Sequence, residues 1–475
     1  MEEQNIKALF TSQLEVANVG VELFYQAVRA QGTAAVQVDW RPPAGGDLRI
    51  AELLGRLERF SGQIDAANRE ARDRMDRGDP VWTGMVYAKD VLPDMDRYTI
   101  GHAGPALTWQ EMCGPLRGAV IGAIQYEGLA QTGEEAEALI AAGKIRFRPN
   151  HSAACVGPMT GMITWSMPLF RVENRAFGNV AYCTINEGLG KVMRFGANDG
   201  SVLARLKWLE TVLAPALQRA VERHGPVSLK VLMAKALAMG DEMHQRNIAA
   251  SSLFARELMP SLVRVVEDRE RLGEIVDFIT GNDQFFLNLA MAACKCICDA
   301  ARDIDGCSLV TAMSRNGTEF GIHVSALRDQ WFRAPVQMPE GLFFPGYGPE
   351  DANPDIGDSA ITETYGIGGF TMAAAPAVVR FVGAASAQAA LDHTRDMYTI
   401  TQGTNTQLTI PGMDFQGAPM GIDIRKVVDS GITPVINTGM AHKKPGVGQV
   451  GAGIVRAPME CFTQALEALA RSFGI

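Results

Sequence analysis

The feature that most constrains the fold is a stretch dense in glycine and acids at residues 343–376, FFPGYGPEDANPDIGDSAITETYGIGGFTMAAAP. Glycine serves where backbone takes positive φ or approaches another group closely, which argues against a solvent-exposed linker. No Lys or Arg stands among these acids before Arg380, so local ion pairs cannot balance them. If buried, they need backbone donors, a distant cation or a ligand. We interpret the stretch as one wall of a polar site, with Asx turns and helix caps as the alternative.

The composition excludes several classes of protein. A chain of 475 residues, 47% hydrophobic and 20% charged, is typical of a soluble globular protein with several domains. The net charge of −9 argues against nucleic acid or anionic membranes as partners, although a local arginine cluster could still bind a small anionic substrate. The start, MEEQNIKALF, lacks the pattern of a signal peptide, and no apolar run reaches the length of a membrane span. We expect a cytoplasmic protein.

Eight cysteines are scattered along the chain, three of them in the segment CKCIC at residues 294–298. No CxxC pair and no suitably spaced histidine accompany them, so we assign no metal site and no cofactor. The surrounding sequence AMAACKCICDAAR is a helical run of small residues, in which cysteine acts as a small hydrophobe.

The pattern of elements predicts a mixed α+β (α/β) protein with two α/β domains and a helical domain between them. Residues 1–200 form the first, because 15–40 reads as a β-α-β unit and 162–186 as a β-hairpin. Residues 201–305 carry apolar residues at helical spacing. Residues 306–475 return to alternating strands around glycine-rich loops. Helices are also predicted from Thr108, where a capping box begins, and over 385–401.

One run inside the helical part is polar on every face, GDEMHQRN at residues 240–247. We expect it within an apolar helix, where burying such groups requires that they pair or bind something. Asp241 would then share a face with His244, orienting the imidazole for proton transfer. The alternative is an internal network that joins helices.

Other polar residues gather at the ends of predicted elements. Lys191 and Arg194 follow a glycine-rich segment that we interpret as a helix start, a plausible cradle for an anion. Arg315-Asn316-Gly317 is a turn signal between two strands, and its arginine is either solvated or placed to bind a carboxylate. The buried strand predicted at 431–442 brings Asn437 to its end, and His442 follows.

No complete motif for a nucleophile, a metal or a phosphate loop is present. The residue types favour recognition of a small planar anion or amide, because arginine binds carboxylate or phosphate and asparagine binds amides. Our candidates for proton transfer are Glu363, His244 and His442. Those for substrate binding share a charged or amide side chain: Lys191, Arg194, Arg315, Asn316, Asn353, Asp358 and Asn437.

Several long motifs carry a resemblance to a known family. They include VENRAFGNVAYCTINEGLGKVMRFGAN, MGDEMHQRN, FPGYGPEDANPDIGDSAITETYGIGGF and INTGMAHKKPGVGQVGAG. Over about residues 14–470 the chain resembles the AllG-type (YlbE/YahG-like) subunit family of oxamate carbamoyltransferase, long carried as a domain of unknown function.

The resemblance implies an oligomeric enzyme in which this chain works with an FdrA-type subunit and a third small subunit. The implied reaction, in purine and allantoin catabolism, is the phosphorolysis of oxalurate to oxamate and carbamoyl phosphate. It supplies no catalytic residues, so the candidates above rest on the clusters alone. Two alternatives stay open: a scaffold subunit with no chemistry of its own, and an enzyme acting on another ureido or carbamoyl substrate.

Overall fold

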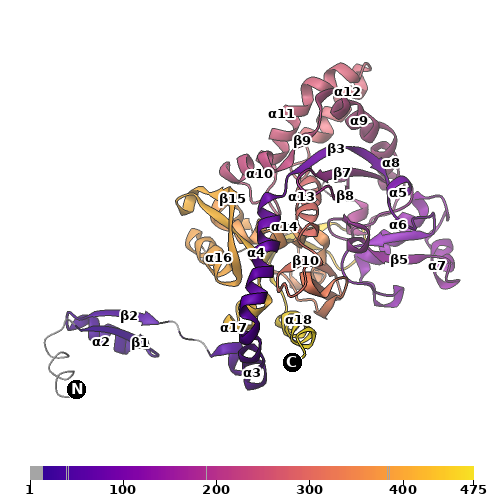
Figure 1. Cartoon of the computed structure of the whole chain (residues 1–475). Coiled ribbons are helices and arrows are strands. Elements are labelled where there is room, and N and C mark those ends of the chain that lie inside the picture. Colours follow the sequence, from indigo (N-terminus) through magenta and orange to yellow (C-terminus); the bar gives the residue numbers. More distant parts are fainter. Residues whose placement is uncertain (1–13, 39, 41, 189, 382, 384–385) are drawn as a thin grey trace, which may run out of the picture.

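The computed structural model describes residues 14–38, 40, 42–188, 190–381, 383 and 386–475 (Figure 1). Its elements mix helices with parallel and antiparallel sheets, which confirms the predicted mixed class. In this part of the chain no helix combines the length and apolar character needed to cross a bilayer.

The predicted β-α-β unit near the N-terminus is confirmed. Strand β1 pairs in parallel with β2, and α2 connects them (β1 Glu15–Val19, α2 Glu22–Ala30, β2 Ala34–Val38). Figure 1 shows this unit apart from the rest of the protein, and α2 buries none of its residues. Val19, Phe24 and Val36 are therefore more than half exposed.

An antiparallel-rich sheet carries the predicted hairpin, which is also confirmed. Strand β7 pairs with β8, and Gly178 turns the chain between them with φ +77°. The order in the sheet is β6-β8-β7-β3-β9 (β3 Pro80–Tyr87, β6 Cys155–Val156, β7 Pro168–Asn174, β8 Val180–Thr184, β9 Val227–Ser228). Because β9 lies inside the segment expected to be helical, residues from both sides of position 200 share this sheet. The domain boundaries stay a prediction.

A second, parallel pair joins β4 to β5, beside the predicted helix that begins at Thr108 (α3 Leu48–Leu57, α4 Ser61–Arg77, α5 Ala88–Val91, β4 Thr99–His102, α6 Gly114–Tyr126, α7 Gly133–Ala141, β5 Arg146–Pro149). The capping box of Thr108 and Glu111 is present, but the predicted helix start is wrong. The box closes only a short 3-10 turn, and α6 begins at Gly114 with Pro115 in its first turn, where proline is favoured.

Residues 200–299 are mainly helical, as predicted (α8 Gly200–Trp208, α9 Ala214–His224, α10 Leu229–Ala238, α11 Ile248–Val265, α12 Arg269–Thr280, α13 Leu287–Asp299). Helix α13 is buried along its length up to Cys298 and packs against β7 and β8. All eight cysteines are free thiols, and burial raises the pKa of Cys294, Cys296 and Cys298. The prediction that these cysteines act as small hydrophobes is confirmed.

The polar run at residues 240–247 is a loop between α10 and α11, so its expected place within a helix was wrong. Gly240 takes φ +96° and Met243 takes φ +64°, and a right-handed helix excludes both values. The run reverses the chain and carries its polar groups into the protein.

The C-terminal third builds three further sheets. The first has the order β12-β11-β10-β14, and α14 follows β14 directly (β10 Val310–Asn316, β11 Glu319–Val324, β12 Phe332–Pro335, β14 Ile356–Gly357, α14 Ile361–Tyr365). The others are β13-β18-β17 and β15-β16, and four helices surround them (β13 Glu340–Phe343, α15 Pro376–Phe381, α16 Ala387–Ile400, β15 Thr401–Ile410, β16 Gln416–Ile422, α17 Ile424–Ser430, β17 Val435–Ala441, β18 Gln449–Arg456, α18 Met459–Ser472). The predicted helix at 385–401 and the buried strand are confirmed, but the strand continues to Ala441, so Asn437 lies inside it and not at its end.

Two apolar cores meet at the start of α14. The larger core gathers aromatic residues of the β6-β8-β7-β3-β9 sheet and of the helices, and Ile361 and Tyr365 of α14 belong to it. The second core lies among the C-terminal strands and α18, and it includes Ala360 and Phe370. Residues 360–370, which include Glu363, are therefore packed between two apolar cores.

Candidate active site

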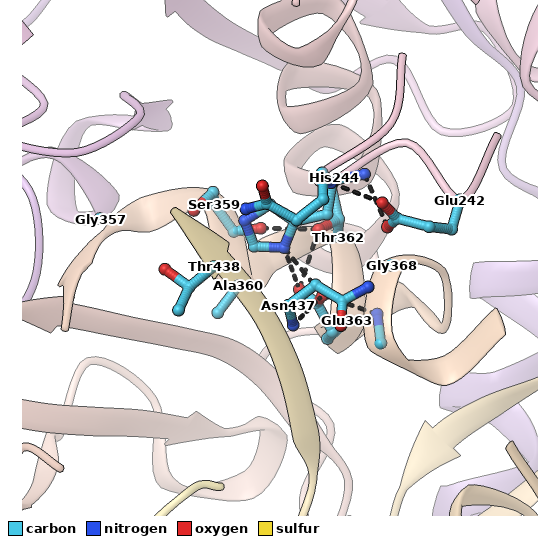
Figure 2. Close-up of polar contacts among 12 residues, drawn as sticks. Glu242, His244, Gly357, Ser359, Ala360, Thr362, Glu363, Gly368, Asn437 and Thr438 are labelled. Atoms are coloured by element: carbon cyan, nitrogen blue, oxygen red, sulfur yellow. Dashed lines mark hydrogen bonds and ion pairs between the residues drawn. The ribbon is translucent and has the colours of Figure 1, made fainter. Parts of the chain in front are cut away.

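The centre of the candidate site is a pair formed by Glu363 and His244 (Figure 2). Glu363 on α14 is fully buried, and His244 comes from the loop at 240–247 with 3% of its surface exposed. His244 Nδ1 lies 2.8 Å and 3.0 Å from the two carboxylate oxygens. Because a carboxylate accepts, Nδ1 carries the hydrogen and donates. Nε2 makes no hydrogen bond within the described residues, so it is available to a substrate.

Three further donors fix the Glu363 carboxylate. The backbone N–H groups of Gly369 and Asn437 donate to Oε1 at 2.8 Å and 3.2 Å, and the Thr362 hydroxyl donates to Oε2 at 2.9 Å. Gly368 permits this arrangement, because it takes φ +63° and a Cβ there would lie 2.1 Å from Oε1. The glycines at 368 and 369 therefore serve close approach, as expected of this stretch.

Asn437 supplies the feature that points most directly to a ligand. Its side chain, on β17, is fully buried, yet neither Nδ2 nor Oδ1 has a partner among the described residues. Leaving a buried primary amide unpaired is unfavourable. Since an amide offers two donors and an acceptor, it complements a molecule bearing carbonyl and N–H groups.

The loop that carries His244 contains two polar residues that were not among the sequence candidates. The Glu242 carboxylate accepts backbone N–H groups of the loop, and burial raises its pKa to about 7, reinforced by Glu363 and opposed by His244. Arg246 is half-buried and pairs with Asp241 at 3.2 Å. The expected contact of Asp241 with His244 is replaced by the ion pair with Arg246 and by a hydrogen bond from the N–H of Ala250. The polar run was the signal for both residues, although its conformation was mispredicted.

Arg315 is completely buried beside the predicted turn, which excludes the solvated alternative, and it binds a carboxylate of the chain itself. It lies in β10 and forms two hydrogen bonds to Asp355, of 2.6 Å and 3.1 Å, and a third to the carbonyl of Gly357. Thr438 of β17 joins this network through Asp355. Arg315 is thus a cation, distant in sequence, that balances Asp355 of the glycine-rich stretch. It also donates to Thr438, the residue after Asn437 in β17, and so stabilises that strand.

Asp358 is a second fully paired acid. Its oxygens accept from the N–H groups of Gly104 and Gly157, the amide of Asn150 and the hydroxyl of Ser314. Burial raises the pKa of Asp358, and these hydrogen bonds act in the opposite direction. The residue ties together four separate segments, which fits a structural role.

Two buried histidines beside Asp358 were not predicted. His151 Nε2 lies 3.5 Å from Asp358, and its ring packs near those of His323 and Trp331. None of the four ring nitrogens of His151 and His323 has a hydrogen-bond partner within the described residues. Burial, with Lys295 and Arg302 nearby, lowers the pKa of His323 to about 3, and that of His151 falls as well.

Asn316, Asn353 and His442 hold backbone in place. Asn316 Oδ1 accepts the N–H groups of Thr318 and Glu319 and so closes the β10–β11 turn. Asn353 donates to the neighbouring carbonyl, and His442 Nδ1 accepts the N–H of Lys444. At about 3.3 Å per residue along the strand, His442 lies roughly 16 Å from Asn437. The structure therefore does not bring His442 to Glu363.

Lys191 and Arg194 lie outside this centre, and the helix start expected before them was wrong. The described residues nearby form only a short 3-10 turn, Met193–Phe195, and α8 begins at Gly200. Lys191 is largely exposed and pairs with Asp199. Arg194 is buried, donates to the carbonyl of Gly188, leaves Nε unpaired and borders a cavity of about 30 Å³. Its role in anion binding stays a prediction.

The described residues contain no cluster of three or more His, Cys, Asp or Glu side chains that could hold a metal ion. The residues that the structure brings together are Glu363, His244 and Asn437, braced by Arg315. An oriented imidazole beside an unpaired buried amide is suited to proton transfer at a carbonyl compound.

Comparisons with known proteins identify the family of the chain. The family model described as oxamate carbamoyltransferase subunit AllG matches residues 145–359. The oxamate carbamoyltransferase subunit AllG of Escherichia coli (strain K12) is 51% identical over 414 residues, which cover 87% of this chain and 99% of that protein. The uncharacterized protein YahG of the same strain is 44% identical over 471 residues, or 99% of this chain and 100% of YahG.

Among solved structures, a conserved protein of unknown function from Enterococcus faecalis V583 has a TM-score of 0.85 and 44% sequence identity. The match covers 86% of this chain and 98% of that one. Identity at this level over nearly whole relatives confirms the resemblance drawn from the motifs. The chain belongs to the AllG family of oxamate carbamoyltransferase subunits.

Proposed function

We propose that this chain carries the acid–base centre of a carbamoyltransferase that converts oxalurate and phosphate to oxamate and carbamoyl phosphate. The observation that carries the proposal is the oriented His244 imidazole beside the unpaired amide of Asn437. Family membership supports the carbamoyl chemistry. The substrate, the direction and the pathway, purine and allantoin catabolism, are part of the proposal.

The reaction requires one proton to move between two atoms of the substrates. A phosphate oxygen attacks the ureido carbonyl carbon, a C–O bond forms, and the C–N bond to the oxamate nitrogen breaks. His244 Nε2 accepts the proton of the attacking phosphate hydroxyl and returns it to the leaving nitrogen. Glu363 keeps the ring oriented and stabilises its positive charge between the two transfers. Asn437 donates to the carbonyl oxygen as negative charge develops there.

The anionic groups of the substrates need cations that the centre only partly supplies. Arg315 is already committed to Asp355, and Lys191 lies outside the centre. Arg246, two residues after His244, is the half-buried cation of the same loop. We infer that the remaining positive charge comes from other subunits, which supports an enzyme active only as a complex.

The proposed assembly follows from the same family. This chain would work with an FdrA-type subunit and a third small subunit, as a cytoplasmic oligomer that uses no cofactor in this chain.

The test is formation of carbamoyl phosphate from oxalurate and phosphate, measured with the chain alone and with both partner proteins added. We expect activity only in the mixture, and its loss with His244→Asn or Glu363→Gln. Full activity of both variants in the complex would contradict the proposal and favour a scaffold role. Activity with a different ureido acid but not with oxalurate would contradict the substrate assignment alone.

A further inference from the structure

We propose that Glu242 is a positioning residue that holds the loop at 240–247 so that His244 faces Glu363. The inference rests on the proposed role of His244. The Glu242 carboxylate forms its hydrogen bonds within its own loop and not with Glu363 or the proposed substrate atoms, so it would act through the imidazole.

The geometry of the loop is the first argument. The Glu242 carboxylate accepts three successive backbone N–H groups, from His244 at 2.9 Å, Gln245 at 2.5 Å and Arg246 at 2.7 Å. Successive N–H groups that converge on one anion form a concave nest, which persists only while the anion stays in place. The backbone of His244 is part of this nest, so its position depends on the carboxylate.

The strain in the loop is the second argument. Met243 takes φ +64°, which residues with a side chain adopt rarely, and it stands directly between Glu242 and His244. The N–H of Met243 donates to the carbonyl of Arg246 at 2.9 Å, so the turn closes on itself. Such a conformation persists only where surrounding contacts determine it, and the bonds to Glu242 are those contacts.

Glu242 also contacts the glycine turn that lies against Glu363. Its carbonyl accepts the N–H of Gly368 at 2.8 Å, and Gly368 is the residue packed against the Glu363 carboxylate. One residue thus fixes the loop that carries the imidazole and the glycine turn that packs against Glu363 (Figure 2).

The charge of Glu242 matters because its neighbours are themselves charged or titratable. His244 faces it from its own loop and Glu363 faces it from α14, whereas Arg246 contacts it only through its backbone N–H and pairs its side chain with Asp241. Burial raises its pKa to about 7, so its proton is exchanged near neutrality. A protonated acid accepts N–H groups less strongly than a carboxylate. We expect activity to rise with pH through about 7 as the carboxylate forms.

The test compares Glu242→Gln with Glu127→Gln in the full chain. Glu127 is a suitable control because it is also a buried glutamate that holds a loop, through the N–H and hydroxyl of Ser166. Two measurements are made: NMR of ¹⁵N-labelled histidine rings in the chain itself, and kcat, KM and the pH profile of carbamoyl phosphate formation in the assembled enzyme.

We expect Glu242→Gln to shift the His244 ring signals, lower kcat about ten- to hundredfold with KM within about threefold, and remove the rise near pH 7. Glu242→Asp should restore part of kcat, and Glu127→Gln should do none of this. Unchanged His244 signals in a folded Glu242→Gln chain would overturn the inference, whatever the activity shows. If those signals shift but His244→Asn keeps full activity, the positioning is correct and the proposed function is wrong.

Discussion

Glu363 and Asp358 are two buried acids of one glycine-rich stretch. They differ in whether a hydrogen-bond partner keeps a second functional atom available to a substrate. Asp358 is held by N–H groups, an amide and a hydroxyl, and the nearby imidazole of His151, at 3.5 Å, makes no hydrogen bond to it. Glu363 is also held by N–H groups and a hydroxyl, but its remaining partner is an imidazole with a second nitrogen available. An acid therefore becomes part of a reactive centre through the second functional atom of its partner, and burial alone does not distinguish the two.

The largest expected effect is on kcat, and it distinguishes Glu363 from Asp358. His244→Asn or Glu363→Gln should lower kcat of the assembled enzyme by about 10²–10⁴-fold, because the oriented base is lost. Asp358→Asn should keep kcat within about fivefold once the folded fraction is taken into account. Equal losses from Glu363→Gln and Asp358→Asn would remove the distinction between them.

Stability should show the reverse order. Asp358→Asn places an NH₂ group against N–H donors in a fully buried site, so the free energy of unfolding should fall by about 1–3 kcal/mol. Urea unfolding of the isolated chain, followed by circular dichroism, measures the change. Arg117→Ala, at an exposed position whose side chain donates to the carbonyl of Gln110, serves as a surface control with a smaller expected loss.

Two glycine substitutions test whether close backbone approach to Glu363 matters for activity. Gly368→Ala and Gly346→Ala both place a side chain at positive φ, which costs about 1–2 kcal/mol. Only at residue 368 does the new Cβ meet the Glu363 carboxylate, whereas residue 346 has open space around it. Assays of kcat should therefore show a loss of about tenfold or more for Gly368→Ala and little change for Gly346→Ala.

The smallest effect concerns the histidines beside Asp358. The pKa of His323 is lowered to about 3 by burial, so below its ordinary value of 6.5 the unfolded chain binds a proton that the folded chain does not. The stability from this group is present above pH 6.5 and is lost as pH falls toward 3. His323→Gln should reduce the loss of unfolding free energy between pH 6.5 and 5.5 by about 1 kcal/mol. An unchanged loss, measured by urea unfolding at both pH values, would show that the ring is already charged in the folded protein.

Local sequence patterns were sufficient for much of the fold. The β-α-β unit, the hairpin, α13 and the buried strand around Asn437 followed from periodicity and turn residues, which act over short distances. The acids at 343–376 were expected to need backbone donors, a distant cation or a ligand, and Asp358 and Glu363 do accept backbone N–H groups. Arg315 turned out to be that cation for Asp355.

The pairing within the site was beyond those patterns. His244 and Glu363 are 119 residues apart, and neither local spacing nor composition encodes such a contact. The loop at 240–247 was mispredicted because apolar helices flank it on both sides and the period continues through it. The role proposed for Glu242 depends on the positive φ of Met243, and no sequence pattern predicts that conformation.

Because the residues of the candidate site come from distant segments, they leave the ribosome at different times during synthesis. Glu363 joins a residue 119 positions before it and a residue 74 positions after it. At roughly 5–20 residues per second, a ribosome takes about 10–40 seconds between delivering the imidazole and delivering β17. When the interval begins the nascent chain has its helices only up to α10, and until it ends the chain lacks β17, whose backbone donates to the acid. The candidate site is consequently completed late in folding. A chain truncated before β17 would leave Glu363 without one of its backbone donors and without the amide proposed to bind substrate.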